Sequence, residues 1–253
     1  MKKVVIECWD DLLKELQSKK FDRSYYIFRG VTNMGHKLRP KVGRILDGQK
    51  RYSPASEKAL YNRFNQFSVL YRSGRLDDPW ENIALAQHHG LPTRLLDWTF
   101  NPLVAAYFAL EGRVAPEANG SAANSTESAD TETSAAIYVI RLPKQVDVSS
   151  VRSPLDVAKG EILSFLPPHS TPRLAVQSGV FTVHGTPDQD WENKTTQVLQ
   201  LDFDQKEWMN ATKRLLRFGM HRYTLFPDLD GLSKYLQFRY VRGFSLQLAQ
   251  TAR

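Results

Sequence analysis

The chain has 253 residues and a formal net charge of +7 at pH 7, with 34 Lys and Arg against 27 Asp and Glu. Hydrophobic residues make up 42% and charged residues 24%, as in an ordinary globular protein with an apolar core. The single cysteine, Cys8, excludes an internal disulfide and a cysteine-rich zinc site.

The excess of positive charge favours anionic partners such as nucleic acid, nucleotides or phosphates. It does not form the run of five or six basic residues that is typical of a nucleic-acid-binding arm. Because no apolar run is long enough for a signal peptide or a membrane span, we expect a cytoplasmic protein with no membrane partner.

The predicted first half of the chain is rich in helices. In chain order they are a strand at 4–9, a helix that Asp10 caps, a strand at 25–28, helices at 57–73 and 80–89, a strand at 95–96, and a helix at 103–110 that begins at Asn101 or Thr99. Residues 115–135 are mostly Ala, Ser, Thr, Glu and Asn, which predicts a flexible surface insertion.

The second half is richer in strands. The predicted elements are strands at 137–140, 175–176, 180–183 and 196–201, a helix at 208–218 and a short helix at 232–236. Together the two halves indicate an α+β fold with helices flanking a mainly antiparallel sheet.

The most unusual segment is 86–99, AQHHGLPTRLLDWT, which lies between two apolar segments. A connection between a helix and a strand needs only a cap and a turn. This segment instead contains two imidazoles, a guanidinium, a carboxylate and hydroxyls within a few residues. Its polar side chains are therefore candidates for a functional cleft. Asp97 has two possible roles, to bond Arg94 or nearby backbone amides, or to line a pocket beside Arg29.

His88 and His89 end a predicted helix, where a cationic imidazole interacts favourably with the helix dipole. Neighbouring helical residues point about 100° apart, unlike the i, i+4 pairs that bind zinc. No metal site is predicted. We expect one histidine to be structural and the other to face a pocket.

Arg29 and Gln177 lie beside predicted strands. The guanidinium of Arg29, expected at the edge of the sheet, suits a phosphate or carboxylate ligand, or a surface acid, and Gly30 allows close approach of a ligand. Gln177 could fix a hydroxyl or simply belong to a turn, and Arg173 adds a possible anion contact. A shared cleft would bring together Arg29, His89, Asp97, Thr99 and Gln177.

These motifs resemble the FRG domain, a family named for its Phe-Arg-Gly motif. The matching segments are 28–30, 38–44, 87–99, 101–109, 177–181 and 225–231. The resemblance implies a single FRG domain over 1–253 with the insertion at 115–135.

The order of the motifs is also similar to the ADP-ribosyltransferase fold, in which successive strands carry Arg or His, then Ser or Thr, then Glu or Gln. This resemblance implies a split sheet with NAD, the substrate, bound between its halves. It implies catalytic roles for Arg29, Thr99 and Gln177, with Asp97 or Glu192 supplying the charge that Gln177 lacks. The residues implied to bind NAD are Arg29, Gly30, His88, His89, Thr93, Arg94, Asp97 and Phe181.

The implied activity is transfer of ADP-ribose to a macromolecule, as in a bacterial toxin or an anti-phage defence effector. The target would be nucleic acid or a protein, and a neutralising antitoxin is a possible partner. Two alternatives stay open: a non-catalytic nucleotide- or RNA-binding module of the same fold, and a metal-independent nuclease that uses His88, His89 and Asp97. The sequence leaves the oligomeric state open.

Overall fold

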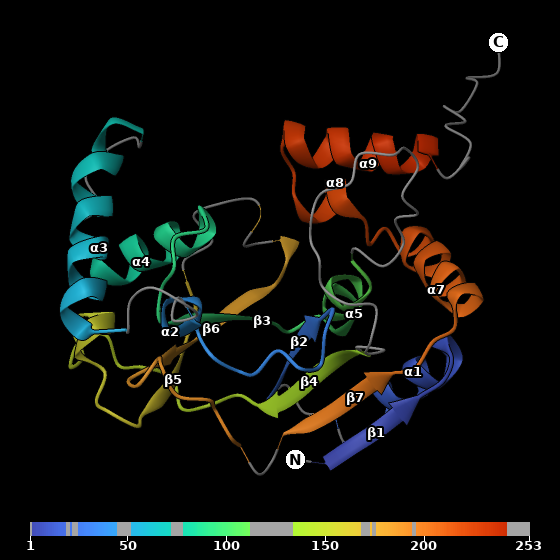
Figure 1. The fold of residues 1–253 in the computed structure, drawn as a ribbon, viewed down its shortest axis with the longest axis horizontal. Coiled ribbons are helices and arrows are strands. Elements are labelled where there is room, and N and C mark those ends of the chain that lie inside the picture. The colour runs from blue at the N-terminus through green and yellow to red at the C-terminus, as the bar shows by residue number, and fades with distance from the viewer. Residues whose placement is uncertain are drawn as a thin grey trace.

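The structure is a computed structural model that describes residues 2–18, 21, 25–44, 52–71, 78–111, 134–167, 173, 176–193 and 196–241. Within these residues, one seven-stranded sheet has the order β1-β7-β4-β2-β3-β6-β5 (Figure 1). β1 and β7 run parallel, and the other neighbouring strands are antiparallel. The strands are β1 (Lys2–Ile6), β2 (Tyr26–Val31), β3 (Leu95–Thr99), β4 (Ala135–Arg141), β5 (Ile162–Phe165), β6 (Gly179–His184) and β7 (Gln197–Leu201).

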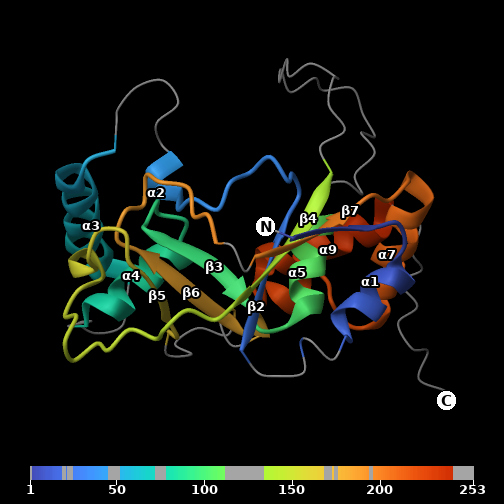
Figure 2. The ribbon, with the colours of Figure 1, turned by 90° about the horizontal axis from the view of Figure 1, so that it is seen from below.

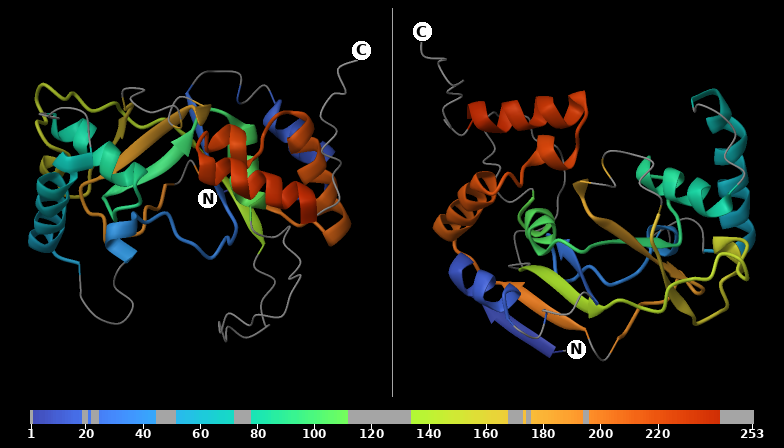
Figure 3. Two further views of the ribbon diagram at one scale, coloured as in Figure 1. Left: turned by 90° about the horizontal axis from the view of Figure 1, so that it is seen from above. Right: turned by 180° about the vertical axis from the view of Figure 1, so that it is seen from behind.

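The helices cover this sheet in two groups, one toward each end (Figure 3). They are α1 (Trp9–Leu16), α2 (Lys41–Arg44), α3 (Pro54–Ser68), α4 (Pro79–His88), α5 (Pro102–Leu110), α7 (Gln205–Arg217), α8 (Arg222–Leu225) and α9 (Leu229–Val241). Buried side chains of α1, α5 and α7 pack with β2, β4 and β7, while those of α3 and α4 pack with β3, β5 and β6. The expected α+β fold, with a mainly antiparallel sheet and flanking helices, is confirmed.

Three of these helices begin with a side-chain N-cap that is followed directly by proline. Ser53, Asp78 and Asn101 each accept a hydrogen bond from a backbone amide of the first helical turn of α3, α4 and α5. Of the two residues expected to cap α5, Asn101 does so. Gly90, with φ of +83°, follows α4 and allows the chain to turn toward β3.

The sheet is weakly joined at its centre, between β2 and β3. These strands pair only at Phe28 and Thr99, and Figure 2 shows them diverging beyond that point. The rest of β2 pairs with β4, and the rest of β3 pairs with β6. A single pairing therefore connects the two halves of the sheet, and the sheet is open on the side of Arg29.

Gly30 sets the distance between β2 and α5. A Cβ atom on this glycine would overlap the backbone carbonyl oxygen of Ala105 and lie 2.6 Å from the amide nitrogen of Ala109. The helix therefore crosses the strand in direct backbone contact.

Several sequence-based expectations about the elements are wrong. Cys8, not Asp10, occupies the N-cap position of α1, and Val176 is helical rather than part of a strand at 175–176. Arg29 does not lie at the sheet edge, because β2 is an interior strand between β4 and β3. Strand β5 was not predicted.

The helix predicted at 57–73 is shorter than expected. It begins at Pro54 and ends at Ser68, and a 3-10 turn follows at Val69–Tyr71. Phe67 and Leu70 are exposed, while Tyr61 is buried. The Tyr61 hydroxyl donates to the Pro79 carbonyl of α4 at 2.8 Å, a tertiary contact that helical periodicity alone does not predict.

The insertion expected at 115–135 lies outside the described residues, except for its last two positions. Ala135 already belongs to β4. Across the described ranges, none of the helices combines the length and apolar character needed to cross a membrane.

Candidate functional site

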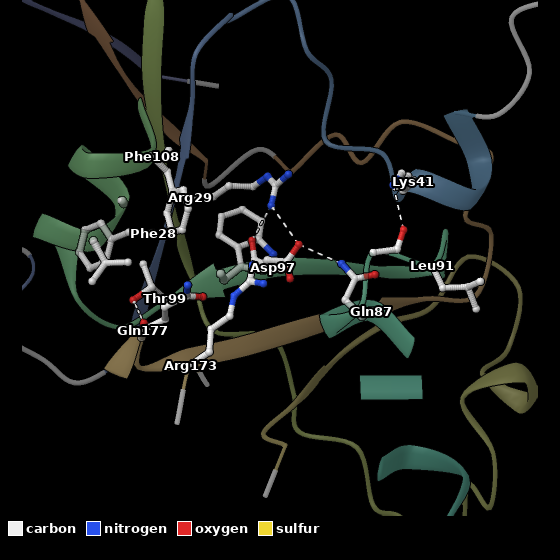
Figure 4. A pocket seen from close by; sticks show the side chains of 15 residues that line it. Phe28, Arg29, Lys41, Gln87, Leu91, Asp97, Thr99, Phe108, Arg173 and Gln177 are labelled. Atoms are coloured by element: carbon white, nitrogen blue, oxygen red, sulfur yellow. Dashed lines mark hydrogen bonds and ion pairs between the residues drawn. The ribbon is translucent and has the colours of Figure 1, made fainter. Parts of the chain in front are cut away.

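A pocket of about 340 Å³ occupies the opening between β2 and β3 (Figure 4). Side chains alternate between the two faces of a strand, so Phe28 and Arg29 contribute to the pocket from opposite faces of β2. Helix α5 closes one side through Val104, Ala105 and Phe108. The opening in the sheet and the loop after α4, through Gly90 and Leu91, therefore position the pocket together.

Arg29 extends from β2 across the opening to β3. Its Nη1 atom donates a hydrogen bond to the backbone carbonyl of Asp97 at 2.7 Å and lies 3.9 Å from the Asp97 carboxylate. Burial lowers the pKa of the Arg29 guanidinium, and the charge of Asp97 opposes that shift. A partly desolvated guanidinium of this kind favours an anionic ligand beside it.

Asp97 presents a carboxylate to the pocket, with 61% of its side chain exposed. Its Oδ2 atom accepts a hydrogen bond of 2.9 Å from the side-chain amide of Gln87. The hydroxyl of Thr93 donates to Oε1 of Gln87 at 2.6 Å and so orients that amide. Of the two roles considered for Asp97, the structure supports the pocket-lining one, with Thr93 acting through Gln87.

Thr99 and Gln177 join three segments at the floor of the pocket. The Thr99 hydroxyl donates to the Gln177 backbone carbonyl at 2.6 Å and accepts from the Asn101 amide at 2.9 Å. The side-chain amide of Gln177 donates to the Leu225 carbonyl at 2.9 Å, which ties the turn before β6 to the end of α8. The neighbouring Ser178 has φ of +46°, a left-handed conformation that marks a tight turn.

The pocket brings together Arg29, Gly30, Asp97, Thr99 and Gln177, but His89 does not line it. The other residues expected to bind NAD do not line the pocket either; they are His88, Thr93, Arg94 and Phe181.

Arg94 and Phe181 lie in the protein interior. Arg94 makes a two-pronged ion pair with Glu57, with Nε–Oε1 and Nη2–Oε2 distances of 2.8 and 2.6 Å. Both side chains are almost fully buried. Phe181 stacks with Phe165 in the core beneath α4.

The two histidines pack against each other at the end of α4, with ring centroids 5.0 Å apart. Burial, and then Arg173 and His89, lower the pKa of His88. The neutral imidazole is therefore favoured there, in contrast to the cationic form that the helix dipole alone favours.

The described lining residues include three cations, Arg29, Lys41 and Arg173, and one carboxylate, Asp97. The aromatic side chains of Phe28, Trp98 and Phe108 line the same space. The pocket thus offers cations for an anionic group and flat apolar surfaces for a planar ring.

Lys41, Gln87 and Phe108 also line the pocket, although the sequence did not mark them as site residues. Each lies in a segment whose motif was recognised, but no local pattern separates a lining residue from its neighbours. In the described ranges, no cluster of three or more His, Cys, Asp or Glu could hold a metal ion.

Residues 24–118 match the family model of the FRG domain. The matched segment includes β2, β3 and α5, and hence most of the pocket, whereas Arg173 and Gln177 lie beyond it. Neither the curated proteins nor the solved structures include a match to this chain.

Proposed function

Starting from the FRG domain at residues 24–118, we propose that the protein is an ADP-ribosyltransferase-like enzyme that uses NAD as its substrate. The observation that carries this proposal is the pairing of Arg29 and Asp97 across the opening of the sheet, in a pocket that Thr99 and Gln177 also line. The cations suit the diphosphate of NAD, and the aromatic side chains suit its rings.

The chemistry requires charge stabilisation more than a strong nucleophile. The bond between the nicotinamide nitrogen and the ribose carbon breaks, and its electron pair leaves with nicotinamide. The acceptor then forms a bond to the ribose carbon and loses a proton. Positive charge develops on the sugar, so a fixed carboxylate accelerates the step.

Asp97 is the residue that we assign to this role. It is the one carboxylate among the described lining residues, and Gln87 holds it in place. Glu192 does not line the pocket. Thr99 and Gln177 maintain the shape of the pocket floor, and Arg29 binds phosphate.

The acceptor in this proposal is a nucleic acid or a protein, as for a bacterial toxin or an anti-phage effector acting in the cytoplasm. The net charge of +7 supports an anionic acceptor.

The test is incubation of the full chain with NAD that carries a label on its adenylate phosphate, together with RNA or cell lysate. We expect label on a macromolecule and release of nicotinamide. Asp97→Asn should slow nicotinamide release by about a hundredfold while ADP-ribose still binds. Asp202→Asn, an exposed carboxylate just after β7, is the matched control.

One observation favours the non-catalytic nucleotide-binding module as a second candidate. Gln177 is neutral, and one N–H of its side-chain amide is used in a hydrogen bond to the Leu225 carbonyl. Binding of ADP-ribose without any loss of NAD would support this module and overturn the enzyme. The nuclease alternative lacks such support, because neither His88 nor His89 lines the pocket with Asp97.

A further inference from the structure

The cations among the described lining residues are held in two different ways. Arg29 and Lys41 each donate a hydrogen bond to a backbone carbonyl, at 2.7 and 2.9 Å. Arg173 instead packs against an aromatic ring, with its Cζ atom 4.4 Å from the centroid of Phe226. A stacking contact of this kind fixes the direction of a guanidinium without neutralising its charge.

The ring that holds Arg173 belongs to the wall of the pocket. Phe226 is buried and lies edge-on against the lining residue Phe108, with ring centroids 6.1 Å apart. A second guanidinium, that of Arg222, also lies over Phe226, but it is ion-paired with Glu111. Of these two guanidinium groups, that of Arg173 is the one that lines the pocket.

Asp97 lies between the lining cations. Figure 4 shows Arg29 and Lys41 on one side of Asp97 and Arg173 on the other. Nη1 of Arg29 is 3.9 Å from the Asp97 carboxylate. Burial lowers the pKa of Arg173, and the charge of Asp97 opposes that shift, so this carboxylate acts on Arg173 as well. The pocket therefore has a cation at each of two ends and a carboxylate between them.

The groups of NAD follow the same order as these charges. The ribose carbon whose bond breaks lies between the diphosphate and the nicotinamide ring. The proposed function, on which this step rests, places Asp97 at that carbon and Arg29 at the phosphates, so the nicotinamide ring falls on the side of Arg173. We propose that Arg173 is a further catalytic residue, which lies against the nicotinamide ring and promotes its departure by repelling its positive charge.

The reaction moves charge in the direction that Arg173 favours. In NAD the nicotinamide ring carries a positive charge. When the bond to the ribose carbon breaks, its electron pair stays on the nicotinamide nitrogen, the ring becomes neutral, and the positive charge passes to the ribose. Positive charge thus moves away from Arg173 and toward Asp97, and both residues lower the barrier. Because Arg173 also repels the intact cationic ring, it weakens the binding of NAD while it accelerates the reaction.

The first test separates turnover from binding, with the full chain. We expect Arg173→Gln to slow nicotinamide release about tenfold, while NAD binds at least as tightly as to the wild type. Arg173→Lys keeps the charge and should retain most of the rate. Arg217→Gln, which removes the same charge at an exposed position of α7, is the matched control and should change neither quantity. An unchanged rate in Arg173→Gln, or a slower rate together with weaker NAD binding, overturns the proposal.

The second test requires no turnover, because NADH carries a neutral ring of nearly the same size as the ring of NAD. We expect the wild type and Arg217→Gln to bind NADH about fivefold more tightly than NAD, and Arg173→Gln to lose this preference. Equal affinities in the wild type overturn the proposal. If the preference depends on Arg173 but NAD releases no nicotinamide, the proposed transferase function fails, and the placement of the ring beside Arg173 holds. If nicotinamide is released but the preference is absent, only the role of Arg173 fails.

Discussion

Gly30 of β2 and Ala105 of α5 are in direct backbone contact, with no space between them for a side chain. Both residues line the pocket, and Arg29 precedes the glycine. The Arg-Gly pair thus combines two tasks at neighbouring positions. Arg29 provides charge to the opening of the sheet, and Gly30 lets α5 lie close enough to close the pocket.

We predict that Gly30→Ala destabilises the fold by about 3 kcal/mol or more, because the new Cβ atom meets backbone rather than a side chain that could move. The free energy of unfolding in urea measures this effect. Gly35→Ala is the matched control, since a Cβ atom there meets only the side chain of Asn33, at 3.0 Å. Equal stability of the two variants would show that α5 can shift away from β2.

The elements that the sequence predicts well are those with local signals. The helix predicted at 80–89 and the cap at Asn101 follow from residues within one or two turns of each other. β5 has only four residues, Ile162–Phe165, which is too short for its pattern to be distinguished from a loop.

The candidate site was predictable only in part, for a physical reason that Arg94 and Asp97 illustrate. They lie three positions apart in one motif, yet Arg94 is buried against Glu57 and Asp97 faces the pocket. The alternation of side chains along a strand places neighbours on opposite faces. Which face is buried depends on α3, which lies far away in the sequence and carries Glu57. The position of Arg29 was mispredicted for the same reason, because no local sequence pattern shows that β2 is an interior strand of the sheet.

The buried ion pair between Glu57 and Arg94 leads to a second prediction. Glu57→Gln leaves a buried guanidinium without its counter-charge and should cost about 3 kcal/mol or more. The double variant Glu57→Leu/Arg94→Met should recover part of that loss, since it buries no charge. Glu161→Gln, at an exposed position, is the control in the same urea titration. A single variant as stable as the control would contradict this role.

A third prediction concerns the pH dependence of stability. His184 is buried beside Thr182, with Nε2 and Oγ1 3.0 Å apart, and burial, then Arg29 and Arg94, lower its pKa to about 3. In the unfolded chain, His184 binds a proton near pH 6.5. Below this pH, His184 is therefore protonated more fully in the unfolded state than in the folded state. The contribution of His184 to the free energy of unfolding is therefore retained above pH 6.5 and is lost progressively as the pH drops toward 3.

Between pH 6.5 and 5, His184 alone should lower the free energy of unfolding by about 1.5 kcal/mol. Urea titrations across this range measure the slope for the wild type, for His184→Gln and for the exposed control His36→Gln. We expect the slope to decrease only in His184→Gln. An unchanged slope in that variant would assign the pH dependence to other groups.

Gln177 provides the fourth prediction, because the ADP-ribosyltransferase resemblance makes Gln177→Glu an obvious attempt to raise activity. In this structure the side-chain amide donates to the Leu225 carbonyl, and a carboxylate there would face an acceptor with no proton to donate. We expect Gln177→Glu to lower the free energy of unfolding by about 1–3 kcal/mol and not to increase nicotinamide release from NAD. Gln189→Glu, which adds the same charge at an exposed position, should leave both quantities unchanged. Faster nicotinamide release by Gln177→Glu would move the stabilising carboxylate of the proposed reaction from position 97 to position 177.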